Sequence, residues 1–195
     1  MQNLLTEIRN CTVCKEFLPN TPKPIVQAST TSKIVIIGQA PGQKVHNSGI
    51  PWDDVSGNNL REWLRVSKET FYNEKMFALI PMGFCFPGTG KTGDLPPRPE
   101  CALLWHHQIL TSMPEVKLTI LIGQYAQNYY LKNNAKKTLT ETVKNYNEYL
   151  PDFLPLPHPS PRNNIWQKKN SWFKESIIPT LQNIIHPYIN LNNEN

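Results

Sequence analysis

The segment KIVIIGQAPG, residues 33–42, decides the fold expected for this chain. Four β-branched apolar residues, Ile34 to Ile37, follow one another without polar alternation, which is typical of a parallel strand buried on both faces. Gly38 and Gly42 bracket the turn behind that strand and allow close approach of the backbone, while Pro41 stiffens it. Ligands of open α/β sheets collect just beyond the carboxyl ends of such strands, so we expect a binding site here. A plain strand-to-loop connection is the alternative interpretation.

The composition narrows the class of protein. The chain has 195 residues, 39% of them apolar and 18% charged, and a formal net charge of +5. This length suits one domain with a sizeable core, so we expect a single domain over residues 1–187 and a disordered tail over 188–195. No apolar run is long enough for a membrane span and no signal-peptide pattern is present, which predicts a cytoplasmic protein without a membrane partner; we also expect a monomer. The excess of basic over acidic residues favours an anionic binding partner.

The order of apolar runs and turns predicts an α/β fold. Besides the run at 34–37, further strands are expected over residues 76–82, 118–122 and 153–157. Helices are expected over residues 1–10, 60–66, 100–113, 124–132 and 172–185. Pro179 interrupts or restarts the last helix, and Ser56 or Asn58 caps the helix that follows a long polar loop over 46–59. Such strand-then-helix units indicate a parallel sheet with helices on both faces.

The chain has four cysteines, which in a reducing compartment are thiols or metal ligands rather than disulfides. Cys11 and Cys14 form a C-x-x-C pair just past the first helix, and fifteen residues separate Cys85 from Cys101. Four thiolates at one site can hold a [4Fe–4S] cluster or a tetrahedral zinc ion. The alternative is that Cys85 and Cys101 are small buried apolar residues and that the C-x-x-C pair has no function.

Two strand-end loops, GQAPG at 38–42 and HPSPRNN at 158–164, carry a resemblance that covers roughly residues 8–182. In order and spacing they are similar to the Gly-x-x-Pro and His-Pro-Ser loops of the uracil-DNA glycosylase superfamily. The resemblance implies a three-layer α/β/α sandwich around a central, mostly parallel four-stranded sheet, and a hydrolase that removes bases from double- or single-stranded DNA. The cysteine spacing resembles that of the iron–sulfur branch, family 4. It implies a [4Fe–4S] cluster, with zinc as the alternative, on Cys11, Cys14, Cys85 and Cys101.

The resemblance also implies roles for residues of the base pocket. His158 stands where the family histidine donates a hydrogen bond to the departing base, and a histidine bonded to a neighbouring carbonyl is the alternative. Trp52 falls where family 4 stacks a phenylalanine on the base, and a core tryptophan is the alternative. Gly38, Gln39 and Ala40 would line the same pocket.

DNA contacts are expected after the His-Pro-Ser motif. The resemblance assigns groove and phosphate contact to Ser160, Arg162, Asn163 and Asn164, and Lys168 would extend the basic face. A solvated helix surface is the alternative interpretation of the lysine.

The first loop departs from the family pattern. Family 4 has a glutamate at its second position, where this chain has Gln39 followed by Ala40, so the loop contains no general base. Gln39 can orient a water or the base but cannot accept a proton. The nearest carboxylates in sequence, Asp53 and Asp54, are candidates for that role, and the alternative is that they are helix-leading or loop-solvating acids.

The second departure concerns base choice, because Pro81 stands where uracil-specific branches have an asparagine. We therefore expect a DNA-repair N-glycosylase that releases a deaminated or damaged base, uracil or a related one. The alternative is a catalytically weak or inactive DNA-binding, damage-sensing protein of the same fold. A small-molecule α/β protein unrelated to this family is the third interpretation.

Overall fold

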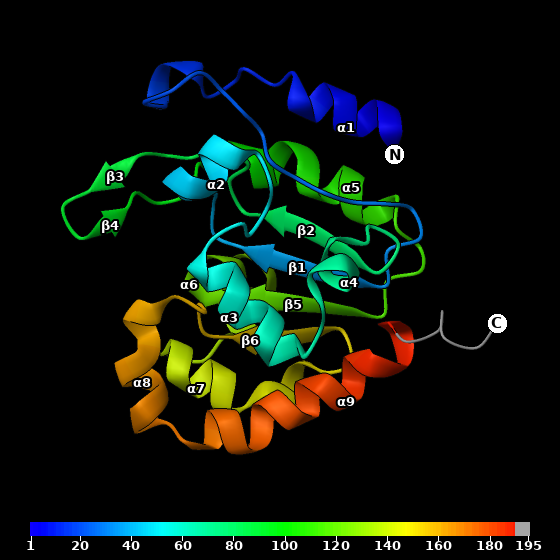
Figure 1. Cartoon of the computed structure of the whole chain (residues 1–195), viewed down its shortest axis with the longest axis vertical. Helices are drawn as coiled ribbons and strands as arrows, with labels where there is room; N and C mark the ends of the chain where they lie inside the picture. Colours follow the sequence, from blue (N-terminus) through cyan, green and yellow to red (C-terminus); the bar gives the residue numbers. More distant parts are fainter. Residues whose placement is uncertain (190–195) are drawn as a thin grey trace.

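The computed structural model describes residues 1–189 and centres on a four-stranded parallel sheet (Figure 1). Its strand order is β2-β1-β5-β6, and each neighbouring pair is parallel. The strands are β1 (Ile34–Gly38), β2 (Phe77–Pro81), β5 (Leu118–Ile122) and β6 (Phe153–Leu156). All five residues of β1 are buried, as its uninterrupted apolar run predicts. The expected α/β fold is confirmed, and the central sheet is parallel throughout.

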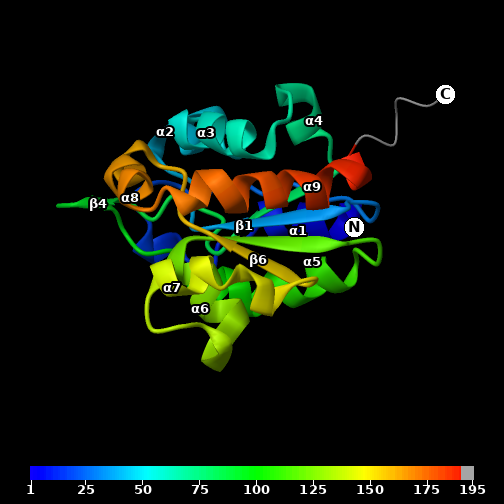
Figure 2. The same ribbon diagram turned by 90° about the horizontal axis from the view of Figure 1, so that it is seen from below.

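Helices cover both faces of this sheet, which gives the expected three layers (Figure 2). Ile34 and Ile36 of β1 face one apolar cluster, to which α3 (Val55–Leu64), α4 (Lys68–Tyr72) and α9 (Ile178–Ile189) contribute. Val35 and Ile37 face the second cluster, built with α1 (Gln2–Arg9), α5 (His107–Thr111) and α6 (Gly123–Leu131). Because alternate strand residues point to opposite faces, one run of four apolar residues serves both cores.

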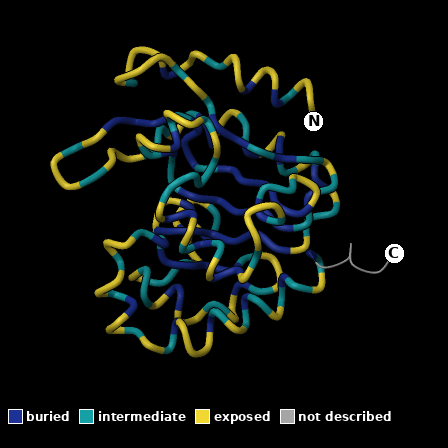
Figure 3. Tube along the Cα trace, in the orientation of Figure 1, coloured by how far each residue is buried: buried dark blue, intermediate teal, exposed yellow. Residues whose placement is uncertain are grey.

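The remaining α-helices and strands lie in the segments that connect these elements. They are α2 (Gln43–Ser48), the hairpin strands β3 (Thr89–Gly90) and β4 (Gly93–Asp94), α7 (Leu139–Lys144) and α8 (Asn164–Lys169). A π-helical segment, Ala102–His106, leads into α5. The hairpin extends beyond the sheet edge at which the strand arrows end and is largely exposed (Figures 1 and 3). Among residues 1–189, no helix has the length and apolarity needed to cross a membrane.

The start of α3 lies earlier than the sequence predicts. The polar loop expected over 46–59 is shorter, because α2 ends at Ser48 and α3 begins at Val55. Asp54 caps α3 in place of Ser56 or Asn58: its carboxylate accepts a hydrogen bond from the backbone N–H of Gly57. Aspartate, serine and asparagine are all good N-cap residues, so the sequence alone did not distinguish among them.

The C-terminal helix also extends further than expected. A π-helical segment, Phe173–Ile177, ends two residues before Pro179 and accommodates the N–H that proline lacks, so the helix continues past it. Tyr188 and Ile189, expected to open the disordered tail, instead continue α9. The rest of that predicted tail, 190–195, lies outside the described residues.

Candidate functional site

A cavity of about 460 Å³ opens at the carboxyl edge of the sheet. The first loop, Gly38 to Gly42, forms one wall, and Trp52 and His158 come from two other connections. Three charged side chains, those of Asp54, Asp94 and Arg162, also line the cavity. Two loops about 120 residues apart in the sequence thus line one cavity, because parallel strands end at the same edge of a sheet.

The hydrogen bonding of His158 defines which ring nitrogen carries its proton. The backbone N–H of Ser160 donates to Nδ1 of His158 at 3.2 Å, so the proton of the neutral ring lies on Nε2. Burial lowers the pKa of His158, and the nearby Asp54 carboxylate partly opposes that shift. The Asn163 side-chain amide donates to the His158 carbonyl at 2.8 Å and fixes the loop. His158 is therefore a partly buried, neutral and oriented hydrogen-bond donor.

Trp52 is held in an unusual backbone conformation beside His158. Its φ angle is +57°, in the left-handed region that few non-glycine residues adopt. Its ring lies against Gly38, where an added Cβ would be only 2.7 Å from Cζ2, and Gly57 leaves room for the Trp52 carbonyl. The ring centroids of Trp52 and His158 are 5.8 Å apart. Although Trp52 also packs partly on the core, two glycines and a strained backbone direct its ring to the cavity.

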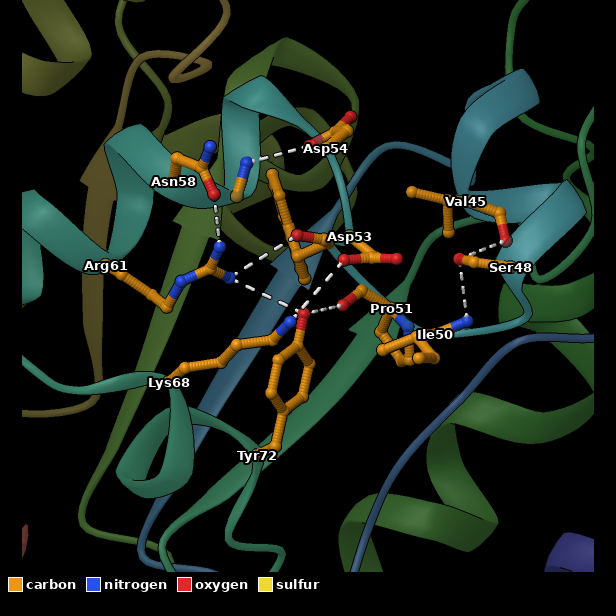
Figure 4. A network of polar contacts seen from close by, with 12 residues as sticks. Val45, Ser48, Ile50, Pro51, Asp53, Asp54, Asn58, Arg61, Lys68 and Tyr72 are labelled. Atoms are coloured by element: carbon orange, nitrogen blue, oxygen red, sulfur yellow. Dashed lines mark hydrogen bonds and ion pairs between the residues drawn. The ribbon is translucent and has the colours of Figure 1, made fainter.

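The segment before α3 is fixed by a polar network around Arg61 (Figure 4). The Arg61 guanidinium lies 3.5 Å from both the Trp52 carbonyl and the Tyr72 hydroxyl, and Tyr72 donates to the Pro51 carbonyl at 2.9 Å. Neither Arg61 nor Tyr72 was identified as a site residue from the sequence. Together they hold the backbone that carries Trp52.

The two neighbouring aspartates point apart (Figure 4). The carboxylate of Asp53 lies 3.9 Å from Nζ of Lys68 on α4, outside the cavity. Asp54 lines the cavity, but one of its oxygens accepts the Gly57 N–H at 2.8 Å to cap α3. Of the two carboxylates suggested by the sequence, only Asp54 reaches the site, and it has a structural partner there.

The first loop and the end of β2 are tied together by backbone bonds. Met82 and Gly83 donate to the carbonyls of Gly38 and Gln39 at 2.9 and 3.0 Å. Gln39 and Ala40 line the cavity, as does Pro81 from β2. Pro81 brings no side-chain donor or acceptor to this wall.

The buried side chain of His106 forms a hydrogen bond to the backbone of Pro81. Burial lowers the pKa of His106 to about 4, so its ring is neutral at pH 7. Its Nε2 donates to the Pro81 carbonyl at 3.0 Å, and Nδ1 then accepts from the Tyr130 hydroxyl at 2.6 Å. His106 was not singled out from the sequence, because nothing in a helical run distinguishes a buried histidine from an exposed one.

The β3–β4 hairpin contributes Thr92, Gly93 and Asp94 to the lining of the cavity. Asp94 lines the cavity close to Gly42, where an added Cβ would lie 3.2 Å from Oδ2 of Asp94. Arg162 donates from Nη1 to the Thr92 carbonyl at 3.2 Å, and its guanidinium lies against Gly93. Burial raises the pKa of Asp94, the positive charge of Arg162 opposes this shift, and Asp54 adds to it. The sequence analysis missed Asp94.

Residues 26–182 match the profile of the family described as the Uracil DNA glycosylase superfamily. The chain belongs to this superfamily. The matched span contains the four-stranded sheet and all the residues that line the cavity except Ile25.

Two side chains of the loop over residues 158–164 already form hydrogen bonds within that loop. Ser160 accepts the backbone N–H of Arg162 at 3.3 Å, and the Asn163 side chain bonds to His158 as described above. Arg162, Asn164 and Lys168 are exposed, so their side chains are accessible to a partner.

The four cysteines gather around a second, small cavity. Cys11, Cys14, Cys85 and Cys101 all line it, and all four are free thiols. Burial raises the pKa of Cys85 to about 11 and that of Cys101 to about 12, and the other cysteine thiols contribute to both shifts. Within residues 1–189, however, no three His, Cys, Asp or Glu side chains are grouped so that they could hold a single metal ion. The thiols share one cavity without converging on one point.

This arrangement of the four thiols suits a [4Fe–4S] cluster better than a single zinc ion. In a [4Fe–4S] cluster each thiolate binds a different iron, whereas a tetrahedral zinc needs all four on one centre. Four free thiols that line one cavity are the donor set that such a cluster takes.

Proposed function

We propose that the protein is a DNA N-glycosylase that releases a deaminated or damaged base, uracil or a related one. The observation that carries this proposal is the hydrogen bond from the Ser160 N–H to Nδ1 of His158, which leaves the proton of the neutral ring on Nε2. His158 lines the same cavity as Trp52. Base release requires that a nucleotide leave the duplex, that the base be held, and that negative charge on the departing base be stabilised. Trp52 meets the second need and His158 the third.

His158 would act as an electrostatic stabiliser rather than as a strong acid. A neutral imidazole donates a hydrogen bond that strengthens as charge develops on the base, and the low dielectric of a buried site increases its effect. Burial lowers the pKa of His158, which keeps the ring neutral near pH 7. This supports donation of a hydrogen bond without transfer of the proton.

The cavity favours recognition of a base edge by Gln39. A volume of about 460 Å³ lies within the range of small-molecule sites. Since Pro81 offers no side-chain polar group, the carboxamide of Gln39 supplies the donor and acceptor on that side. An amide can pair with more than one base edge, so hypoxanthine and xanthine belong among the candidate substrates beside uracil.

DNA would approach over the exposed basic residues next to the cavity. Arg162 and Lys168 are exposed, and the chain carries a formal net charge of +5. Phosphate contacts of this kind position the duplex, while the cavity selects the base.

We propose further that Cys11, Cys14, Cys85 and Cys101 hold a [4Fe–4S] cluster. When bound, the cluster supplies a structural crosslink, because it closes the long loops between its ligands. Cys85 and Cys101 flank residues 86–100, which include the β3–β4 hairpin, and Cys11 and Cys14 tie the N-terminal segment to the same place.

The test of the glycosylase function is a cleavage assay at abasic sites. Duplexes and single strands carrying uracil, hypoxanthine or xanthine are incubated with the wild type, and the abasic product is cleaved with hot alkali and resolved on a gel. Release of at least one base by the wild type supports the proposal. Binding to the same DNA without release of any base would instead favour the DNA-binding alternative, to which the lack of a carboxylate in the first loop gives specific support.

A further inference from the structure

The hairpin β3–β4 brings to the cavity the kind of group that the first loop lacks. The loop Gly38 to Gly42 contains no side chain that can accept a proton. Asp94, the last residue of β4, lines the same cavity, with Oδ2 close to Gly42 of this loop. Figures 1 and 2 show the hairpin extending from the same edge of the sheet at which β1 ends.

Two other carboxylates near the site already have partners. Asp53 forms an ion pair with Lys68 outside the cavity, and Asp54 accepts the Gly57 N–H that begins α3. The carboxylate of Asp94 also has neighbours, the side chain of Thr89 across the hairpin and the Arg162 guanidinium, and both of them lower its pKa. Of these three aspartates, Asp94 is the one that lines the cavity without serving as a helix cap.

The hairpin is positioned by residues of the second loop. Arg162 bonds to the Thr92 carbonyl and lies against Gly93, whose φ angle of +145° suits glycine. The loop that presents His158 is therefore joined directly to the hairpin that presents Asp94. Partial desolvation also raises the pKa of Asp94 above its ordinary value, which makes its carboxylate a better proton acceptor than an unperturbed aspartate.

We propose that Asp94 holds and deprotonates the water that attacks the sugar, a role that rests on the glycosylase function proposed above. The water oxygen forms a bond to C1′ of the deoxyribose, and its proton passes to the Asp94 carboxylate and then to solvent. The C1′–N bond breaks, and its electron pair leaves with the base, which is stabilised by His158 and then protonated from solvent. One water is consumed, and no oxidant or other co-reactant is needed.

The experiment measures single-turnover base release and DNA affinity for the full chain and its variants. Asp94→Asn should slow release by about 10² or more, the range of a lost general base, without weakening DNA binding. Asp94→Ala should lose release likewise and regain part of it in added formate, because a small carboxylate can enter the vacated space. Asp152→Asn, an exposed aspartate in the turn before β6, is the matched control and should release base at the wild-type rate.

Each possible result supports or overturns the proposed role of Asp94. Wild-type release by Asp94→Asn would overturn the role of Asp94 while leaving the glycosylase function intact. Parallel losses of release, DNA affinity and thermal stability in both variants would also overturn it, since they indicate a structural aspartate. If the wild type released no base from any substrate, the glycosylase function itself would fail, and the role of Asp94 with it.

Discussion

The backbone N–H of Ser160 donates to Nδ1 of His158 at 3.2 Å, and this bond sets the tautomer of the histidine. An imidazole that accepts at Nδ1 from a backbone amide must carry its neutral-form proton at Nε2. The amide belongs to the main chain two residues further on, so the orientation of the ring is built into the loop.

The first prediction is that His158→Ala lowers base release by about 10² or more, because a preorganised donor to the developing anion is lost. Gln39→Ala should cost less, since Gln39 positions the base or a water without stabilising charge. Single-turnover rates on the best substrate measure both effects. Base release that is unchanged in His158→Ala would contradict the assignment of the site.

The second prediction concerns the platform formed by Trp52. An added methyl group at Gly38 would lie 2.7 Å from the Trp52 ring, so Gly38→Ala should displace the ring. Trp52→Ala removes it altogether, and base–aromatic stacking contributes about 1–3 kcal/mol. Both variants should raise KM at least as much as they lower kcat, because stacking acts on ground and transition states alike. Trp52→Phe, the control, keeps an aromatic face and should retain most of the affinity; an unchanged KM in Trp52→Ala would refute the platform.

The third prediction concerns salt dependence at Arg162. One guanidinium nitrogen bonds to the Thr92 carbonyl, and the side chain is otherwise exposed. If Arg162 contacts a phosphate, Arg162→Ala should reduce the slope of log affinity against log salt by about one. Lys117 is exposed just before β5, at the opposite edge of the sheet, so Lys117→Ala should leave the slope unchanged. Equal slopes for all three proteins would show that Arg162 makes no phosphate contact.

The sheet could be predicted from the sequence because its strands are uninterrupted apolar runs that end in glycine or proline turns. The β-branched run Ile34 to Ile37, short and followed by glycine and proline, favours a strand covered on both faces over a buried helix. The meeting of the first loop with His158 followed from that assignment, since parallel strands end at one edge.

Asp94 could not be found in the same way. Each strand of its hairpin has two residues, and the surrounding segment is dominated by glycine and proline, which carries no periodic signal. The hairpin is joined to the site by long-range contacts, such as the bond from Arg162 to the Thr92 carbonyl across seventy residues and the approach of Asp94 to Gly42. The partners of Asp53 and Asp54 were equally hidden, because adjacent residues point in directions that depend on where α3 begins.

The fourth prediction is that the protein purified without oxygen contains iron and sulfide. Cys85→Ser should lose them and increase hydrogen exchange in residues 86–100, which Cys85 and Cys101 flank. Exchange in β1 and β5 of the same molecule serves as the internal control and should change little. Protein that contains neither iron nor zinc would contradict the metal centre, and zinc without sulfide would replace the cluster by the single-ion alternative.

The last prediction concerns acid stability and His106. The ring of His106 is buried between Pro81 and Tyr130, and burial lowers its pKa to about 4, below the ordinary value of about 6.5 in an unfolded chain. Between these two values the unfolded state binds more protons than the folded state. Stability from the neutral ring is therefore fully present above pH 6.5 and is lost as the pH falls toward 4.

Denaturant unfolding should accordingly show a loss of about 2 kcal/mol between pH 7 and pH 5 from this residue alone. His106→Gln should be less stable at pH 7, because the Pro81 carbonyl and the Tyr130 hydroxyl lose part of their hydrogen bonding. Its stability should nevertheless vary less with pH over the same interval, since the titrating group is gone and all other groups are shared. The difference between the two pH curves isolates His106, and parallel curves would show that its ring is already charged or exposed in the folded protein.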